Sequence, residues 1–308
     1  ISANGQVQKV PVPGTAFPLQ SAALVSGQGG VMHLFWVHDS TSTTRTLNYT
    51  QYNGSGWSGQ RTAIHSMTGT FTDSLYSITG LRLNSGRLLA VWRFNFTHLT
   101  YSDDNGATWA NPIELPTGTS SLTRRQAVSG GLTVNQAGTL IYGYVRSGAM
   151  RRITSTDNGV TWSAEETLNS AVTNAVSGSV LESSAGKLTA VYSVKSAQGG
   201  TIFSVRSEDG GSTWGTPLEI TPSADYSADP RIVKTGGDSI IVLYEKLVKT
   251  PFANIYQRDL YTVVSGNGGT TWSAEQQLTK YTGNDRFANV QQGTSYYTLI
   301  TSRDNTTK

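Results

Sequence analysis

The chain has no cysteine among its 308 residues. Disulfides, thiolate zinc sites and cysteine nucleophiles are therefore excluded. Charged residues are scarce as well, at 14% of the total, and the formal net charge is only +3. So small a net charge gives no reason to expect nucleic acid as a partner. No apolar run reaches the roughly 18 residues that a membrane-spanning helix needs, so no membrane span is predicted.

Two further absences limit the chemistry. The four histidines, at positions 33, 38, 65 and 98, are scattered without metal-ligand spacing, so no metal site is predicted. No segment shows a sustained helical period, whereas a phosphate-binding glycine loop needs a helix after it. No cofactor is therefore expected, and structural calcium at surface turns stays an open alternative.

The start and the composition of the chain bear on its location. The sequence begins with Ile1 rather than methionine, which is typical of a processed N-terminus. Serine, threonine, glycine and asparagine are abundant, a composition that suits short strands and many turns and is common in secreted proteins. We therefore expect a secreted, extracellular or cell-surface protein.

What the sequence does contain is a repeat. The motif Ser-x-Asp-x-Gly-x-Thr-Trp, in which Asn or Gly replaces some residues, occupies positions 102–109, 155–162, 207–214 and 265–272. A worn copy covers 52–57, and from Trp57 onward the tryptophans follow one another at intervals of 52, 53, 52 and 58 residues. A regular period of this size indicates repeated structural units.

The motif has a local mechanism. An Asp or Asn side chain accepts hydrogen bonds from nearby backbone N–H groups, and the glycine after it tolerates a positive φ, so the pair makes a tight turn. The tryptophan anchors the turn by burying a large ring. We therefore assign structural roles to Asp104, Asp157, Asp209, Asn267, Trp109, Trp162, Trp214 and Trp272.

The motif resembles the Asp-box, or bacterial neuraminidase repeat, of the sialidase-like β-propellers. The resemblance implies an all-β fold, a six-bladed β-propeller of four-stranded antiparallel blades. Short stretches of alternating polarity between Gly and Asn turns agree with it. One domain is expected over 1–308, with blades at about 17–64, 71–116, 122–168, 172–220 and 226–279.

The last blade is expected to combine residues 283–308 with 1–15, so that strands from both termini close the ring and cover the sheet edges. Its third strand and Asp-box are missing from the sequence. Either this blade is short or the natural chain continues past Lys308. An incomplete blade would also offer an edge to a protein partner.

In propellers of this kind, ligands bind at the face where the second strands end and the first strands begin. The second-strand ends carry basic and aromatic residues, which are Arg93, Arg146, Lys195, Lys246 and Arg303 with Trp36, Trp92, Tyr144, Tyr192 and Tyr244. Arg125 and Arg231 come from the loops before first strands. Arginine forks match carboxylate or sulfate groups, and aromatic faces stack on sugar rings. The pattern favours an anionic carbohydrate bound at a basic mouth of the central channel. The alternative is that the bases are solvated and the aromatics pack between blades.

The resemblance also implies which groups a sialidase would use. These are three arginines that bind the substrate carboxylate, a Tyr–Glu nucleophile pair and an Asp acid/base. The stretch that matches the first arginine, 17–21, contains none. The positions that match the glutamate and the second arginine are Ser177 and Ser193. Sialidase activity is therefore not carried over to this chain.

Three classes of function stay open. Glycan recognition is favoured, because the basic and aromatic residues are present where the sialidase catalytic groups are missing. A carbohydrate-active enzyme would be a divergent glycosidase with two carboxylates drawn from Asp73, Asp229 and Glu245. It could instead be a uronate polysaccharide lyase, with His38, Tyr144 or Tyr244 as the base and Arg146 to neutralise the uronate. The third class is a structural or interaction module of an extracellular assembly.

Overall fold

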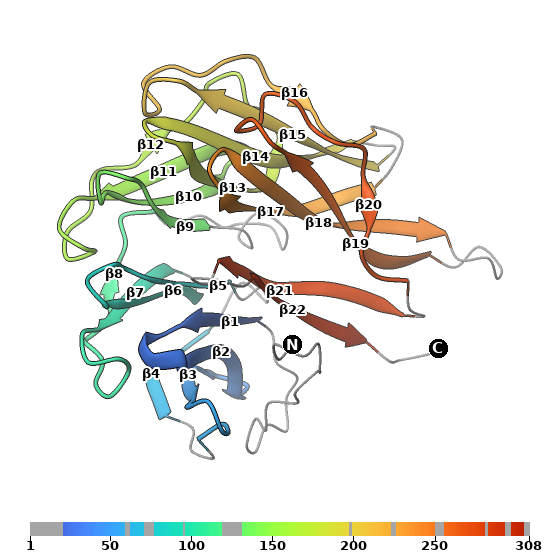
Figure 1. Cartoon of the computed structure of the whole chain (residues 1–308). Coiled ribbons are helices and arrows are strands. Elements are labelled where there is room, and N and C mark those ends of the chain that lie inside the picture. The colour runs from blue at the N-terminus through green and yellow to red at the C-terminus, as the bar shows by residue number, and fades with distance from the viewer. Residues whose placement is uncertain are drawn as a thin grey trace. The chain divides into compact units, whose positions relative to one another are not determined.

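The computed structural model describes residues 21–58, 62–70, 77–94, 96–118, 131–196, 199–222, 226–249, 256–280, 283–292 and 297–304 (Figure 1). For 196, 199, 286–292 and 297–304 it describes the backbone alone. Within these ranges every regular element is a β-strand, apart from the three-residue 3-10 helix η1 (Gln28–Gly30). The all-β prediction is thus confirmed, and no helix of the described residues is long and apolar enough to cross a membrane.

The strands form five four-stranded antiparallel meanders, which we number sheets 1 to 5 in chain order. Sheet 1 contains β1 (Ser21–Ser26), β2 (Met32–Thr41), β3 (Thr44–Tyr52) and β4 (Thr62–Thr68). Sheet 2 contains β5 (Ile78–Arg82), β6 (Leu88–Phe94), β7 (Phe96–Ser102) and β8 (Ile113–Glu114). Sheet 3 contains β9 (Gly131–Val134), β10 (Leu140–Arg146), β11 (Ala149–Ser155) and β12 (Glu166–Thr167).

Sheet 4 contains β13 (Ala175–Ser184), β14 (Lys187–Ser196), β15 (Gly199–Ser207) and β16 (Leu218–Glu219). Sheet 5 contains β17 (Tyr226–Gly236), β18 (Ser239–Lys249), β19 (Tyr256–Ser265) and β20 (Gln276–Gln277). A single parallel pair, Gly200 with Tyr226, joins these two sheets. The remaining pair is β21 (Asn284–Gln292) with β22 (Tyr297–Asp304).

The contacts within the chain group it into two compact units. Unit 1 comprises residues 1–115 with 289–300, and unit 2 comprises 116–288 with 301–308. Sheets 1 and 2 therefore belong to unit 1, and sheets 3, 4 and 5 to unit 2. The single domain and the closed sixth blade stay predictions, and the N-terminal strand expected within 1–15 lies outside the described residues.

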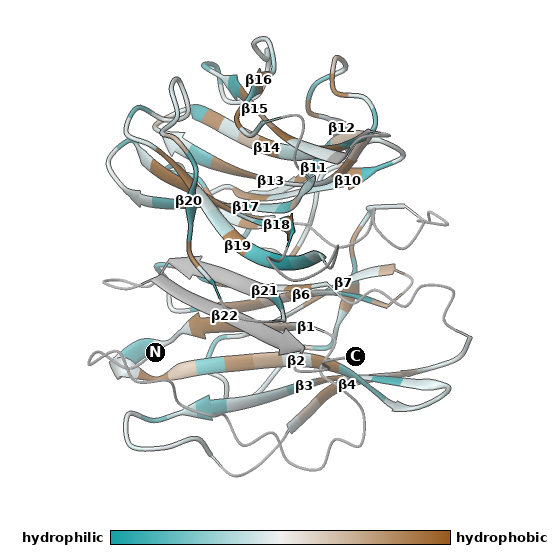
Figure 2. Ribbon diagram, turned by 90° about the vertical axis from the view of Figure 1, so that its right-hand side faces the viewer, coloured by the Kyte–Doolittle hydropathy of each residue, from teal (hydrophilic) through white to brown (hydrophobic). Residues whose placement is uncertain are grey.

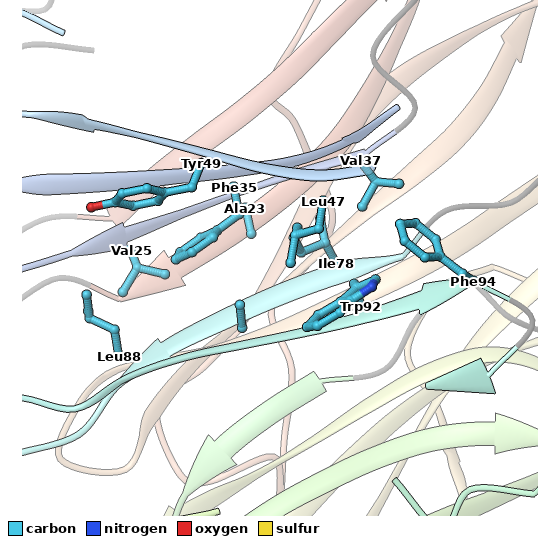
Figure 3. Close-up of a cluster of buried hydrophobic side chains, with 11 residues drawn as sticks. Ala23, Val25, Phe35, Val37, Leu47, Tyr49, Ile78, Leu88, Trp92 and Phe94 are labelled. Carbon is cyan, nitrogen blue, oxygen red and sulfur yellow. The ribbon is translucent and has the colours of Figure 1, made fainter. Parts of the chain in front are cut away.

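In each unit the core lies between neighbouring sheets. In unit 1, Phe35, Val37 and Leu47 of sheet 1 face Ile78 and Trp92 of sheet 2 (Figure 3). All five side chains are at most 4% exposed. In unit 2, similar clusters join sheet 3 to sheet 4 and sheet 4 to sheet 5. The apolar residues that fill these interfaces lie within the strands, whereas the turns between strands are mostly polar (Figure 2).

Glycine allows the sheets to approach each other closely. A Cβ added at Gly143 of sheet 3 would lie 2.2 Å from a methyl group of Val180 in sheet 4. A Cβ added at Gly200 of sheet 4 would lie 2.5 Å from the carbonyl oxygen of Ser227 in sheet 5. Neither separation is sterically possible, so these two positions need glycine for packing rather than for a special φ.

The Asp-box turns connect the third and fourth strands, as the sequence predicts. In the 155–162 copy, Thr161 donates to Asp157 from its N–H (2.9 Å) and from its hydroxyl (2.5 Å). The two residues after Asp157, which are Asn158 and Gly159, have positive φ values of 58° and 90°. The box tryptophan then packs on the core between sheets, as Trp109 does in an edge contact with Phe35 at 5.2 Å. The box thus fixes both the turn and the position of the neighbouring sheet.

Candidate functional site

A β-bulge interrupts β17, the first strand of sheet 5. Ala228 pairs with Glu245 and Arg231 pairs with Leu243, so Asp229 and Pro230 together oppose the single residue Tyr244. Proline cannot donate to a ladder hydrogen bond and within sheets occurs at edges or bulges. Asp229 has a φ of 52°, a left-handed conformation that a non-glycine residue adopts at a cost of roughly 1–3 kcal/mol. Bulges of this kind often re-aim side chains next to functional sites.

The bulge brings charged groups of three strands onto one face. Side chains alternate along a strand, so the pairing register places Arg231, Glu245 and Arg258 on the same face of sheet 5. Arg258 donates to Glu245 over 3.1 Å, and its guanidinium carbon lies 5.8 Å from the ring centre of Tyr226. We call Tyr226, Asp229, Arg231, Glu245 and Arg258 the sheet 5 cluster.

The charges of the cluster act on one another. Burial lowers the pKa of Arg231, whereas the charges of Asp229 and Glu245 and the phenol of Tyr142 in sheet 3 act to raise it. Glu245 is 5% exposed, and the Arg258 side chain is 20% exposed. Because guanidinium groups stay protonated in proteins, the cluster contains two fixed cations beside two carboxyl groups. Such a site offers both donors and acceptors to a polar ligand.

A second carboxyl pair, Asp259 with Asp285, lies nearby. Asp259 is 1% exposed and accepts hydrogen bonds from Gln257 (3.0 Å) and Gln277 (2.7 Å). Burial raises its pKa, the two amides oppose that shift, and the charge of Asp285 adds to it. Asp285 is also 1% exposed. Because the oxygens of Asp259 already accept from two amides of the same sheet, we assign this pair to the interior rather than to a site.

Sheet 4 shows what replaces the sialidase groups. Ser177 and Ser193 are cross-strand partners, and their hydroxyl oxygens are 2.6 Å apart. Both residues are at most 3% exposed. The two positions that the sequence resemblance matches to a catalytic glutamate and a carboxylate-binding arginine thus hold one buried hydroxyl pair. That pair satisfies its own hydrogen bonds and offers no charge to a substrate.

Sheets 3 and 5 contain a Tyr–Glu pair that sequence reasoning missed. The hydroxyl of Tyr144 donates to Glu165 over 2.5 Å, and that of Tyr244 donates to Glu275 over 2.8 Å. Each glutamate stands three residues after its box tryptophan, and in both copies the residues between are Ser-Ala. The sequence contains a signal for these pairs. Sheets 3 and 5 combine a glutamate three residues after the box tryptophan with a Tyr-x-Arg/Lys pattern in the second strand. Sheets 2 and 4 have proline in place of the glutamate and lack that pattern.

These pairs are structural. A Tyr–Glu pair resembles a sialidase nucleophile, but here it recurs at equivalent positions in two sheets. Burial raises the pKa of Tyr144, and its hydrogen bond to Glu165 raises it further, so the phenol is held neutral. The ring of Tyr244 is completely buried. Each pair ties the second strand of its sheet to the segment after the Asp-box.

The same glutamates neutralise two bases of the predicted mouth. Arg146 pairs with Glu165, and Lys246 pairs with Glu275. Lys195 is exposed at the end of β14. Arg93 lies in unit 1, is 6% exposed and donates to the Thr97 hydroxyl over 3.4 Å. The ring of bases as a whole stays a prediction, and two of its members already have carboxylate partners within their own sheets.

The aromatic residues of the predicted mouth need correction. The structure buries all of them, with none more than 8% exposed, which holds for Trp36, Trp92, Tyr144, Tyr192 and Tyr244. Trp92, Tyr192 and Tyr244 belong to the cores between sheets. For these three residues the structure supports the alternative drawn from the sequence, aromatics packed between blades. A sugar ring cannot stack on side chains that are already buried.

The remaining candidates divide into two groups. His38 is 3% exposed, and its Nδ1 lies 2.7 Å from the side-chain nitrogen of Asn48, so it is a core residue of unit 1. Asp73 and Arg125 lie outside the described residues, and the Arg303 side chain is not described. Among the described residues, no three His, Asp or Glu side chains gather as a metal site.

The cluster itself was only partly predictable. Asp229, Arg231 and Glu245 were among the candidates, although as separate residues. The sequence pattern did not single out Arg258, because it lies near the start of a third strand, whereas ligand contacts were predicted from first-strand starts and second-strand ends. In each sheet the third strand starts beside the end of the second strand, so it reaches the same end of the sheet. The Pro230 within an inner strand was the available signal for the bulge.

The fold and the repeated turns define the class of protein, the sialidase-like proteins built from BNR repeats. The BNR repeat-like domain matches residues 89–307, so the chain belongs to this family. No curated protein sequence matches the chain.

Solved structures show the same fold. A protein of unknown function from Dyadobacter fermentans DSM 18053 has a TM-score of 0.65 at 14% identity, over 89% of this chain and 85% of that one. The Hadza microbial sialidase Hz136 has a TM-score of 0.55 at 17% identity, over 86% of this chain and 59% of its own length. The Penicillium chrysogenum α-L-arabinanase complexed with arabinobiose has a TM-score of 0.52 at 20% identity, covering 74% of this chain and 75% of that one. At such identities the likeness shows the fold alone. The fold is nevertheless one that carbohydrate-acting proteins use.

Proposed function

We propose that this protein is a secreted carbohydrate-binding protein whose site is the sheet 5 cluster. The observation that carries the proposal is the meeting of Arg231, Arg258, Asp229 and Glu245 at a strained bulge. Sugars present many hydroxyl groups, which donate to carboxylates and accept from guanidinium groups. The frame we infer is a six-bladed propeller, with the cluster at the mouth of its channel. The sugar-acting relatives of the same fold support the ligand class.

The cluster also bears on the kind of sugar. An acidic glycan, predicted from the sequence, would have to compete with Glu245 for Arg258, because their contact is already 3.1 Å. A neutral sugar meets donors and acceptors without that competition. We therefore expect the acidic preference to be modest, and to come from exposed bases such as Lys195 rather than from the cluster itself.

Hydrolysis is the second candidate, and one observation favours it. Asp229 and Glu245 are two carboxyl groups on adjoining strands, and the charges of both act on Arg231. Glycosidases use two carboxyl groups about 5–10 Å apart. Glu245 already neutralises Arg258, which suits a fixed carboxylate, whereas Asp229 is the more exposed of the two. In such a hydrolase, Asp229 and Glu245 would be the two catalytic carboxyl groups, one acting as the acid and the other as the base or nucleophile.

The test is a glycan array that includes sialosides, uronate polysaccharides and arabinans, probed with wild type, Asp229→Asn and Arg258→Gln. Asparagine tolerates the left-handed φ of residue 229, so the first variant keeps the bulge. We expect both variants to lose at least tenfold in affinity, about 1.4 kcal/mol. The matched control is Arg206→Gln, because Arg206 also pairs with a glutamate, Glu208 at 2.8 Å, but next to the Asp-box turns.

The outcomes separate the alternatives. Unchanged binding by both variants would show that the site lies elsewhere. A wild-type protein that binds no glycan would overturn carbohydrate binding and favour the structural or interaction module of an extracellular assembly. Shortened products from a bound glycan, lost in Asp229→Asn and Glu245→Gln, would establish the enzyme.

A further inference from the structure

The hairpin between the second and third strands of sheet 5 has the longest strands of the five described meanders. β18 and β19 contain 11 and 10 residues, those of sheets 1 and 4 contain 10 and 9, and those of sheets 2 and 3 contain seven each. In Figure 1 this hairpin is the pair labelled β18 and β19. Its last cross-strand pair is Lys249 with Tyr256. The extra length therefore carries one basic and one aromatic residue away from the body of the sheet.

Tyr256 is unlike the tyrosines of the second strands. It is 56% exposed, whereas Tyr144, Tyr192 and Tyr244 are at most 8% exposed. Lys249 beside it is exposed as well. A large aromatic side chain left open to solvent at a strand end contributes little to folding. Tyrosine nevertheless combines a flat apolar ring with a polar tip, which suits contact with a sugar.

The pair continues the face that carries the sheet 5 cluster. Side chains alternate along β18 and β19, so Lys249 and Tyr256 project to the same side as Glu245 and Arg258. Lys249 lies four positions after Glu245, about 13 Å along the strand at about 3.3 Å per residue, whereas Tyr256 lies two positions from Arg258, about 7 Å. A ligand that reaches from Glu245 to Lys249 and Tyr256 is therefore longer than one sugar ring.

We propose that Tyr256 and Lys249 form an outer subsite, which binds a sugar unit of an oligosaccharide whose end is held at the sheet 5 cluster. The Tyr256 ring would cover the C–H face of that unit, and the Lys249 ammonium would donate to a hydroxyl or carboxylate on it. This inference rests on the proposed function. It adds that the ligand is an oligosaccharide rather than a single sugar, and that contacts with the hairpin make the affinity depend on the length of that oligosaccharide.

The experiment is titration calorimetry with sialic acid oligomers and arabino-oligosaccharides, each as a length series from the monosaccharide upward. For Tyr256→Ala we expect wild-type affinity for the shortest ligand that binds and a loss of about tenfold for the longer ones. Tyr256→Phe should behave as wild type, because it keeps the ring. Lys249→Gln should likewise lower the affinity for the longer ligands and leave that for the shortest one unchanged.

The matched control is Tyr101→Ala. Tyr101 also has a cation beside its ring, Arg87 at 4.0 Å, but it lies near the Asp-box turn of sheet 2. Equal affinities of wild type and Tyr256→Ala at every length would overturn the subsite and leave the proposed function standing. A wild-type protein that binds no member of either series, together with a negative array, would overturn the proposed function itself. Loss of the shortest ligand in Tyr256→Ala would place Tyr256 in the primary site and contradict an outer subsite.

Discussion

At the scale of the residue, Asp157 shows how one side chain specifies an Asp-box turn. It accepts from the hydroxyl and N–H of Thr161 and from the hydroxyl of Ser155, at 2.5, 2.9 and 2.8 Å. These bonds, the Thr161 hydroxyl first, lower the pKa of Asp157 to about 2. In the 265–272 copy Asn267 accepts from the Thr271 N–H and donates to its hydroxyl, both at 2.9 Å. An amide can therefore replace the carboxylate at this position.

We predict that Asp157→Ala lowers the melting temperature, because the N–H and hydroxyl of Thr161 lose their acceptor. Asp157→Asn should cost much less, since Asn267 shows that asparagine makes the equivalent bonds. Thermal unfolding at neutral pH followed by circular dichroism measures both. Equal losses in the two variants would show that charge, rather than hydrogen bonding, holds the turn.

The aspartates of the Asp-boxes also predict how the stability of the fold changes at acid pH. Hydrogen bonds, those from the box threonine first, lower the pKa of Asp104, Asp157 and Asp209 to about 2, from an ordinary value of 3.8. A carboxyl group whose pKa is lower in the folded state stabilises it above the ordinary pKa. That contribution is lost as the pH falls from about 4 to about 2. A triple Asp→Asn variant should therefore show a flatter decline in melting temperature over this interval, and an unchanged slope would contradict the assignment.

At the scale of the element, glycine sets how closely sheets pack. A Cβ on Gly178 of β13 would lie 2.5 Å from Met150 Sδ and 2.7 Å from the Val191 carbonyl oxygen. The first atom belongs to sheet 3 and the second is backbone of β14, so the clash cannot be relieved by one rotamer. Overpacking of this kind costs typically 1–3 kcal/mol.

We therefore predict that Gly178→Ala lowers the free energy of unfolding by about 1–3 kcal/mol in urea denaturation. The matched control is Gly266→Ala, because no atom lies within 4 Å of a Cβ there. The other three copies of the Asp-box carry Asp103, Thr156 and Glu208 at that place, so a side chain fits. The control should change stability by no more than about 0.5 kcal/mol. A tolerated Gly178→Ala would mean that sheets 3 and 4 can separate without cost.

At the scale of the whole molecule, ionisable groups divide unevenly between the two units. All four histidines lie in unit 1. Burial lowers the pKa of His33 and His98 to about 4, and in His98 the charges of His65 and Arg93 contribute as well. Burial also lowers the pKa of His65. A histidine with a lowered pKa stabilises the fold fully above its ordinary pKa of 6.5, and that stability is lost as the pH falls toward 4.

We predict that unit 1 loses stability before unit 2 between pH 6.5 and pH 4. The loss from each of His33 and His98 is at most about 3 kcal/mol. Hydrogen exchange by mass spectrometry, with labelling times scaled to the intrinsic rate at each pH, should show peptides of sheets 1 and 2 exchanging first. Peptides of sheet 5, which carry the candidate site, should keep their protection. Simultaneous loss in both units would show that the chain unfolds as one cooperative body.

The sequence alone determined the repeat and the local turn chemistry. The period of the tryptophans, the Asx–Gly pairs and the short alternating strands predicted four-stranded antiparallel sheets with the Asp-boxes between third and fourth strands. Strands are recognised by their period-two pattern, and turns by residues that tolerate a positive φ. Both signals depend only on residues close together in the sequence. The resemblance to sialidases also singled out Ser177 and Ser193 from the sequence, whereas their cross-strand pairing came from the structure.

Only the tertiary structure decided which side chains are buried and which meet. Trp92 and Tyr244 are aromatic side chains of the kind that stack on sugars, but both are buried in the cores between sheets. Arg146 looked like a free base until Glu165, 19 residues away, was found beside it. Arg258 joined Glu245 and Arg231 because a bulge and a strand register set their faces. Burial and ion pairing depend on partners from other strands and sheets, so no local pattern in the sequence specifies them.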